Sequence, residues 1–204
     1  MEQQSSMEQQ RSSSSNPMGI IVIAGIILFI AMGALGPHSW FMGKWDAAQH
    51  QSLSPATGSS VVGGPSLSAQ KIDAILHYAK SPADGTGQDL YNLSQQYNID
   101  DAFSLAVFLH ESGYGKNGVA ASSLSLGNLR CIDGYSCQGG YAYFPTWQAG
   151  YEAFYKLISG PLYVKAGLTT PGQILPKYAP TGDSNDPVAY ASDVEESIAE
   201  WRAA

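Results

Sequence analysis

The apolar positions of this chain follow three different patterns from one end to the other. Residues 1–17 are mainly Ser and Gln, with Met as the only aliphatic type, and this composition predicts a disordered tail. From Met18 to Leu35 the chain is apolar on every face and carries no charge. As a helix this stretch spans roughly 27 Å, close to the hydrocarbon thickness of a bilayer. We therefore predict a single transmembrane helix over residues 18–36.

A cleaved signal peptide is the alternative interpretation of the apolar stretch. Such peptides have a basic start and an apolar region of about 7–15 residues, whereas here only Arg11 precedes a longer run. Ala34-Leu35-Gly36 resembles a cleavage site, but Pro37 follows it directly. Residues typical of a membrane interface come next, namely Trp40, Phe41, Lys44 and Trp45. We favour a retained anchor; Arg11 and Lys44 balance each other and leave its orientation open.

The segment after the apolar stretch is rich in Ser, Gly and Pro. It contains no Asp, Glu, Lys or Arg between Ala47 and Gln70, which is typical of a flexible linker. We assign residues 37–67 to a juxtamembrane segment and linker, and residues 68–204 to a folded domain.

Most of the domain has the periodicity of amphipathic helices. Ser68 is a candidate N-cap for a first helix, with apolar positions at Ile72, Ile75, Leu76 and Tyr78. The helix that starts at Asp100 or Asp101 and ends at Gly113 and Gly115 is apolar nearly all round, which places it at the domain centre. Other helices are predicted over Gln88–Tyr97, over Thr146–Ser159, from Thr170 onward, and from Asp186 to Arg202.

Residues 122–144 have a different pattern, because glycines separate short stretches of chain. These glycines are Gly127, Gly134, Gly139 and Gly140. We predict a small β-hairpin or irregular lobe here. The expected fold class is α+β, mainly α.

Composition excludes several classes of function. The chain has 10 Lys+Arg against 17 Asp+Glu, a net charge of −7, which disfavours a nucleic-acid partner. It has neither the Gly-x-Ser-x-Gly pattern of serine hydrolases nor the His-Glu-x-x-His pattern of metallopeptidases. His110 has no second His at metal-binding spacing, so we interpret it as a packed residue and expect neither a metal nor a cofactor.

Cys131 and Cys137 are the only cysteines, and both lie in the glycine-rich lobe. Two Cys without nearby His pairs are too few for a zinc site. We predict a disulfide, which implies an oxidising compartment and places the domain outside the cytoplasm. Two free thiols in a cytosolic protein are the alternative.

The candidate for catalysis is Glu111, at the end of the apolar helix. A carboxylate there faces the negative end of the helix dipole, and apolar neighbours disfavour the charged form further. A carboxyl group that stays protonated near neutral pH can act as a general acid. The alternative is an exposed Glu at a frayed helix end.

Four segments of the domain carry a family resemblance when they are taken in order. They are Ile99–Gly115 with His110-Glu111-Ser112-Gly113-Tyr114-Gly115, Ser125 with Gly127-Asn128-Leu129-Arg130, Tyr143-Phe144-Pro145-Thr146-Trp147 with Ala149-Gly150, and Tyr178-Ala179-Pro180 with Asp186 and Tyr190. Together they resemble bacterial endo-β-N-acetylglucosaminidases of the lysozyme-like superfamily, which cut peptidoglycan. The resemblance covers about residues 98–202. It implies a lysozyme-like globular domain with a small β-hairpin lobe.

The resemblance also implies roles for the matched residues. Glu111 would protonate the glycosidic oxygen, and Tyr178 would lie close to the reacting sugar as a second catalytic residue. Asn128 would hydrogen-bond an acetamido group through its amide. The other implied substrate-binding residues are aromatic, with faces on which sugar rings stack: Tyr114, Tyr143, Phe144 and Trp147. The alternative for Phe144 and Trp147 is that they are core residues. Asp186 is interpreted as an N-cap before Pro187.

Two-carboxylate glycosidases need a second group about 5–9.5 Å from the acid. Asp133, in the loop between the cysteines, is the first candidate, and Asp183 is the second. The substrate's own N-acetyl group can assist instead, and then no second carboxylate is needed.

These features together predict a membrane-anchored peptidoglycan hydrolase, an N-acetylglucosaminidase that cleaves β-1,4 glycosidic bonds. Its expected partners are peptidoglycan glycan strands and the lipid bilayer, the latter through residues 18–36. The expected location is the cell membrane, single-pass, with the C-terminal domain outside the cytoplasm. The alternatives are a muramidase or lytic transglycosylase on the same fold, and a non-catalytic cell-wall-binding protein.

Overall fold

The computed structural model describes residues 58–181 and 186–203. The predicted tail, the transmembrane helix 18–36, residues 37–57 of the linker, and Asp183 lie outside these residues. Within the described ranges, no helix combines the length and the apolar character that a membrane crossing requires.

The described chain is mainly helical, with a two-stranded antiparallel sheet, which confirms the predicted α+β class. The helices in chain order are α1 (Ala69–Tyr78), α2 (Gly87–Tyr97), α3 (Asp101–Ser112), α4 (Ala120–Ser123), α5 (Trp147–Ser159), the short 3-10 helix η1 (Val164–Ala166), α6 (Pro171–Tyr178) and α7 (Pro187–Ala203). The strands β1 (Ser136–Gln138) and β2 (Tyr141–Tyr143) lie between α4 and α5.

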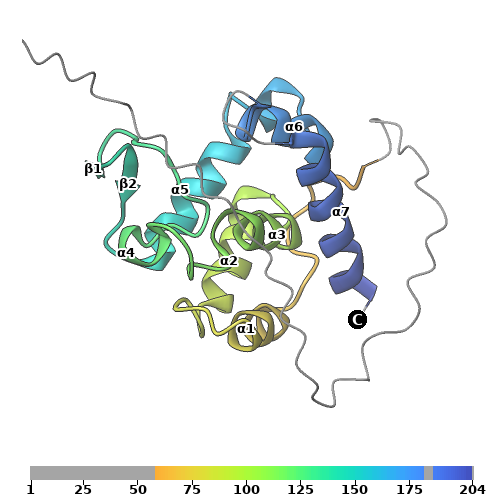
Figure 1. Ribbon diagram of the computed structural model, residues 1–204. Coiled ribbons are helices and arrows are strands. Elements are labelled where there is room, and N and C mark those ends of the chain that lie inside the picture. The colour runs from red at the N-terminus through yellow and green to blue at the C-terminus, as the bar shows by residue number, and fades with distance from the viewer. Residues whose placement is uncertain (1–57, 182–185, 204) are drawn as a thin grey trace, which may run out of the picture. The chain divides into compact units, whose positions relative to one another are not determined.

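Helix α3 is the centre of the domain, as its apolar sequence predicts. Every residue from Asp101 to Phe108 is buried. The Asp100 side chain caps its start by accepting a hydrogen bond from the Ala102 N–H at 3.1 Å, and Gly113 ends it in a left-handed conformation. In Figure 1, α3 lies among the other helices, with the hairpin on one side and α7 on the other.

Local capping side chains start α1, α5 and α7 where the sequence indicates. Ser68 Oγ accepts from the Lys71 N–H at 3.2 Å, and Thr146 Oγ1 accepts from the Ala149 N–H at 3.1 Å. Asp186 Oδ1 accepts from the N–H groups of residues 188 and 189, so Asp186 is the N-cap of α7 as interpreted. The inward placement of Tyr78 is wrong: its position at the last residue of α1 leaves it 91% exposed.

The predicted lobe contains a β-hairpin, whose strands pair Ser136 with Tyr143 and Gln138 with Tyr141. The two turn residues, Gly139 and Gly140, both have positive φ, as a two-residue turn of type I′ requires. The short helix α4 precedes the hairpin and was not expected from the sequence.

Residues 58–67, assigned above to the linker, pack against the domain. Val61 is fully buried, and its N–H donates to the Thr169 carbonyl at 2.8 Å. The Asp100 N–H donates to the Val61 carbonyl at 2.8 Å. Ordered packing therefore begins before Ser68.

Candidate active site

Glu111 lies in the last turn of α3, with its side chain half-buried. The hydroxyl of Tyr190, on α7, donates a hydrogen bond of 2.9 Å to Glu111 Oε1. Tyr190 is itself only 3% exposed, so its hydroxyl approaches Glu111 from inside the protein. One carboxyl oxygen of Glu111 is thus held by a partner 79 residues away in the chain.

The environment of Glu111 favours its protonated form. Burial raises the pKa of Glu111, and this effect outweighs two opposing ones, the hydrogen bond from Tyr190 and the positive charge of Arg130. The position at the helix C-terminus acts in the same direction as burial. The raised pKa is in the direction that a general acid needs, and the catalytic role of Glu111 stays a prediction.

The loop that follows α4 fixes the end of α3. Asn128 Nδ2 donates to the Glu111 carbonyl at 2.8 Å, and Ser112 Oγ donates to the Leu126 carbonyl at 2.8 Å. Asn128 has a φ of 48°, a left-handed conformation that Asn tolerates better than most residues. These contacts position the backbone that carries the Glu111 carboxyl.

Tyr178, at the end of α6, contacts the same loop. Its hydroxyl donates to the Gly127 carbonyl at 2.7 Å. A Cβ at Gly127 would lie 3.1 Å from this hydroxyl and from Phe154, so a glycine is needed for the close approach. Burial raises the pKa of Tyr178, with a further contribution from the charge of Glu111, and the phenol stays protonated. Tyr178 is therefore near Glu111, and its hydroxyl donates its hydrogen bond to a backbone carbonyl.

Asn128, predicted to bind an acetamido group through its amide, uses that amide inside the protein. Its NH₂ group already donates to Glu111, while Oδ1 is buried and has no hydrogen-bond partner among the residues described. Turning the amide over would set Oδ1 against the Glu111 carbonyl, two acceptors facing each other. Binding of an acetamido group by Asn128 stays a prediction.

The aromatic residues expected to bind sugar divide into two groups. Tyr114 and Phe144 are core residues, 3% and 5% exposed, and Phe144 packs against Tyr135 with ring centroids 4.6 Å apart. In this conformation neither presents a ring face to a ligand. Tyr143, on β2, and Trp147, at the start of α5, are half-buried and keep part of their surface accessible.

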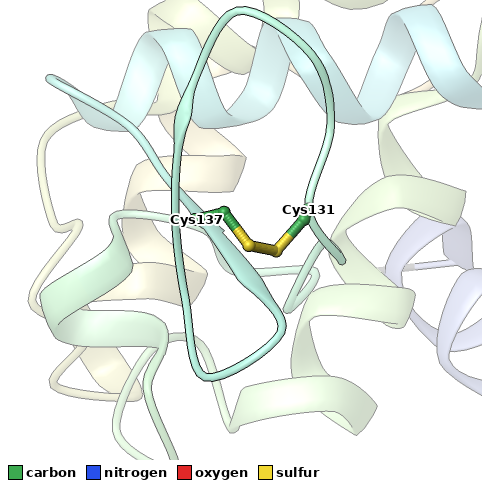
Figure 2. Close-up of a disulfide and its surroundings, with 2 residues drawn as sticks. All are labelled: Cys131 and Cys137. Atoms are coloured by element: carbon green, nitrogen blue, oxygen red, sulfur yellow. A yellow bond between two sulfur atoms is a disulfide. The ribbon is translucent and has the colours of Figure 1, made fainter.

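The predicted disulfide between Cys131 and Cys137 is present, with the two Cα atoms 5.3 Å apart. Figure 2 shows the bridge closing the loop that leads into the hairpin. Asp133, the first candidate for a second carboxylate, is exposed in this closed loop. The structure therefore ties its backbone to the hairpin but does not bury its charge.

Two residues near Glu111 were not assigned a role from the sequence. Tyr190 was matched by the resemblance, but a contact across 79 residues has no local signal. Its ring also stacks on one face of His110, with centroids 3.6 Å apart, although His110 is exposed and is not the packed residue that the sequence suggested. Arg130 was matched in the same way, and its charge acts on Glu111.

Metal-ligating side chains do not gather near this site. Over residues 58–181 and 186–203, no three His, Cys, Asp or Glu residues are placed to hold an ion together.

The chain matches no protein-family model and no curated protein. Among solved structures it is similar to the S. aureus autolysin E in complex with the muropeptide NAM-L-Ala-D-iGlu, with 12% sequence identity over 72% of this chain and 74% of that chain. The TM-score is 0.49. This likeness is too weak to assign a fold family or an activity to the chain.

Proposed function

We propose that this chain is a peptidoglycan hydrolase, an N-acetylglucosaminidase of the lysozyme-like superfamily in which Glu111 is the general acid. The observation that carries the proposal is the half-buried Glu111 carboxyl with a raised pKa, held by the Tyr190 hydroxyl at 2.9 Å. The ordered resemblance of four sequence segments supports the substrate class.

In the proposed reaction Glu111 gives its proton to the oxygen that joins two sugars. The bond from the anomeric carbon to that oxygen breaks, the leaving sugar departs as an alcohol, and Glu111 is left as a carboxylate. The Tyr190 hydroxyl and the charge of Arg130 both favour that carboxylate, so they stabilise the group after it has lost its proton.

Two groups are candidates for the opposite side of the bond. One is Asp133, in the exposed disulfide loop, and the other is the acetamido group of the substrate itself. Inversion at the anomeric carbon would require a base that activates water, for which Asp133 is the candidate. Retention is the outcome both of acetamido participation and of Asp133 acting as a nucleophile, so NMR of the first-formed anomer tests the base role of Asp133.

The proposal includes a location. The apolar residues 18–36 would anchor the chain in a membrane, and the Cys131–Cys137 disulfide supports a domain in an oxidising compartment outside the cytoplasm. A wall hydrolase held there acts on glycan close to the membrane.

The experiment is a digest of purified peptidoglycan by the full chain, with the products identified by mass spectrometry. N-acetylglucosamine at the new reducing ends is the expected result. Muramic acid at the reducing ends would show a muramidase, and anhydro-muramic acid a lytic transglycosylase. Binding to the wall without any cleavage between pH 4 and pH 8 would overturn the enzyme proposal in favour of a wall-binding protein.

A further inference from the structure

Arg130 is held in place by three features of the lobe. Its backbone forms a bridge with Tyr141 of β2, and its guanidinium carbon lies 4.8 Å from the centre of the Tyr141 ring. The next residue, Cys131, is fixed to β1 through its disulfide with Cys137, as Figure 2 shows. A flexible side chain is thereby given a preferred position over an aromatic ring.

The charge of Arg130 is available to a ligand. Arg130 is exposed, and no carboxylate in the described part of the chain lies within ion-pair distance of it. Arg202, by contrast, pairs with Asp100, and Lys156 pairs with Glu152 at 2.8 Å.

Arg130 is also on the same part of the molecule as Glu111. Asn128, two residues earlier in the loop, donates directly to the Glu111 carbonyl at 2.8 Å. The charge of Arg130 is close enough to lower the pKa of the Glu111 carboxyl. A substrate that reaches Glu111 therefore comes within range of this guanidinium.

We propose that Arg130 binds a carboxylate of the glycan substrate beside the bond that is cut. This inference rests on the proposed function and names a specificity-determining residue for it. A planar guanidinium matches a carboxylate with two parallel hydrogen bonds. In cell-wall glycan, carboxylates come from the lactyl group of muramic acid or from the stem peptide, whereas oligomers of N-acetylglucosamine carry none.

The test compares three substrates with the full chain: a neutral N-acetylglucosamine oligomer, glycan strands freed of peptide, and peptide-bearing strands. Arg130→Gln is expected to raise KM about tenfold or more on a carboxylate-bearing substrate and less than twofold on the neutral oligomer. The strand type that shows the loss identifies the source of the carboxylate. Arg130→Lys keeps the charge without the planar fork and is expected to recover part of the loss.

Lys177→Gln is the matched control, because Lys177 is an exposed cation 5.6 Å from the centre of another tyrosine ring, that of Tyr163. It should leave KM unchanged on all three substrates. An equal rise in KM for Arg130→Gln on neutral and charged substrates, or no rise on either, would overturn the inference.

Binding measurements keep this test separate from the proposed function. If the wild-type chain cleaves none of the substrates, the proposed function fails, and calorimetry of the same strands still tests Arg130. Weaker binding of carboxylate-bearing strands by Arg130→Gln, with Lys177→Gln unchanged, would then uphold the arginine site alone. Equal binding by both variants would reject it.

Discussion

The two ends of helix α3 both carry acidic side chains, but the burial and the partners of these side chains differ. At the start, Asp100 and Asp101 are 2% and 1% exposed. Asp100 contacts Arg202, the Ser66 hydroxyl and its own helix, and Asp101 Oδ1 accepts from the N–H groups of Ser66 and Leu67. At the other end, Glu111 is half-buried and its carboxyl has one hydrogen bond, from Tyr190.

This comparison shows that a raised pKa does not by itself mark a catalytic acid. Burial raises the pKa of Asp101 to about 6, although two backbone N–H groups oppose the shift. Asp101 has no surface through which a substrate could reach it. Glu111 combines a raised pKa with a partly accessible carboxyl, and that combination makes it the candidate.

The largest expected effect comes from Glu111→Gln. The amide keeps the size of the side chain but has no acidic proton, so cleavage should fall by about a hundredfold to ten-thousandfold, the usual contribution of a general acid. The free energy of unfolding should change by less than about 1 kcal/mol, because no buried charge pair is broken. Turnover within tenfold of wild type would remove Glu111 from the mechanism.

Asp100→Ala should give the opposite result. It removes an N-cap and the buried carboxylate partner of Arg202, whose side chain is 35% exposed, so we expect a loss of about 2 to 3 kcal/mol in the free energy of unfolding. Activity per folded molecule should be unchanged. Asp84→Ala, which breaks the exposed contact with His77, is the matched control and should cost under about 1 kcal/mol. Equal losses for the two variants would contradict the assigned role of Asp100.

Asp101→Asn tests the pH dependence of the same helix end. Since the pKa of Asp101 is raised in the folded state from 3.8 to about 6, the folded protein binds more protons between these values. The free energy of unfolding should therefore fall as pH rises from about 4 to 6, by about 2 to 3 kcal/mol. Denaturant unfolding across this range should show the fall in wild type and a flatter profile in the variant; identical slopes would refute the shift.

Tyr190→Phe should give the smallest loss of turnover, and it tests whether the Tyr190 hydroxyl controls the pKa of Glu111. Loss of the hydroxyl removes a hydrogen bond that lowers the pKa of Glu111, so the alkaline limb of the pH–rate profile should move to higher pH. Turnover at the optimum should fall about tenfold through lost positioning. Tyr97→Phe removes a similar hydrogen bond, to Glu152 at 3.0 Å, and should alter neither. A shift to lower pH would contradict the assignment.

Local signals explain what the sequence predicted well. A cap is decided within three or four residues, so Ser68 and Thr146 mark their helices correctly. The helix α3 is apolar on nearly every face, and such a surface is stable only when it is buried on all sides. Its central position in the domain therefore follows from its composition. The cysteine spacing and the glycines of the turn were enough to predict the disulfide and the hairpin.

Contacts between distant segments explain the rest. Glu111 and Tyr190 are 79 residues apart, and Arg202 and Asp100 are 102 apart. The Asn128 amide donates to the Glu111 carbonyl because of the path of the loop between them, and residue types do not determine that path. Phe144, next to the hairpin, is buried in the core, and its residue type alone fits a buried position as well as an exposed one.

The hydrogen bonds of residues 58–67 have a mechanical consequence. Tension applied from the N-terminal side reaches the domain first at Ser59, whose N–H donates to Glu195 on α7 at 3.1 Å, and then at Val61 and Ser66, whose partners are Asp100, Asp101 and Thr169. The contacts at Asp100 and Asp101 are separated from Glu111 by about the length of α3, roughly 18 Å for a helix of 12 residues. A chain under load would therefore pull first on α7, the helix that carries the Tyr190 partner of Glu111, and next on the start of α3.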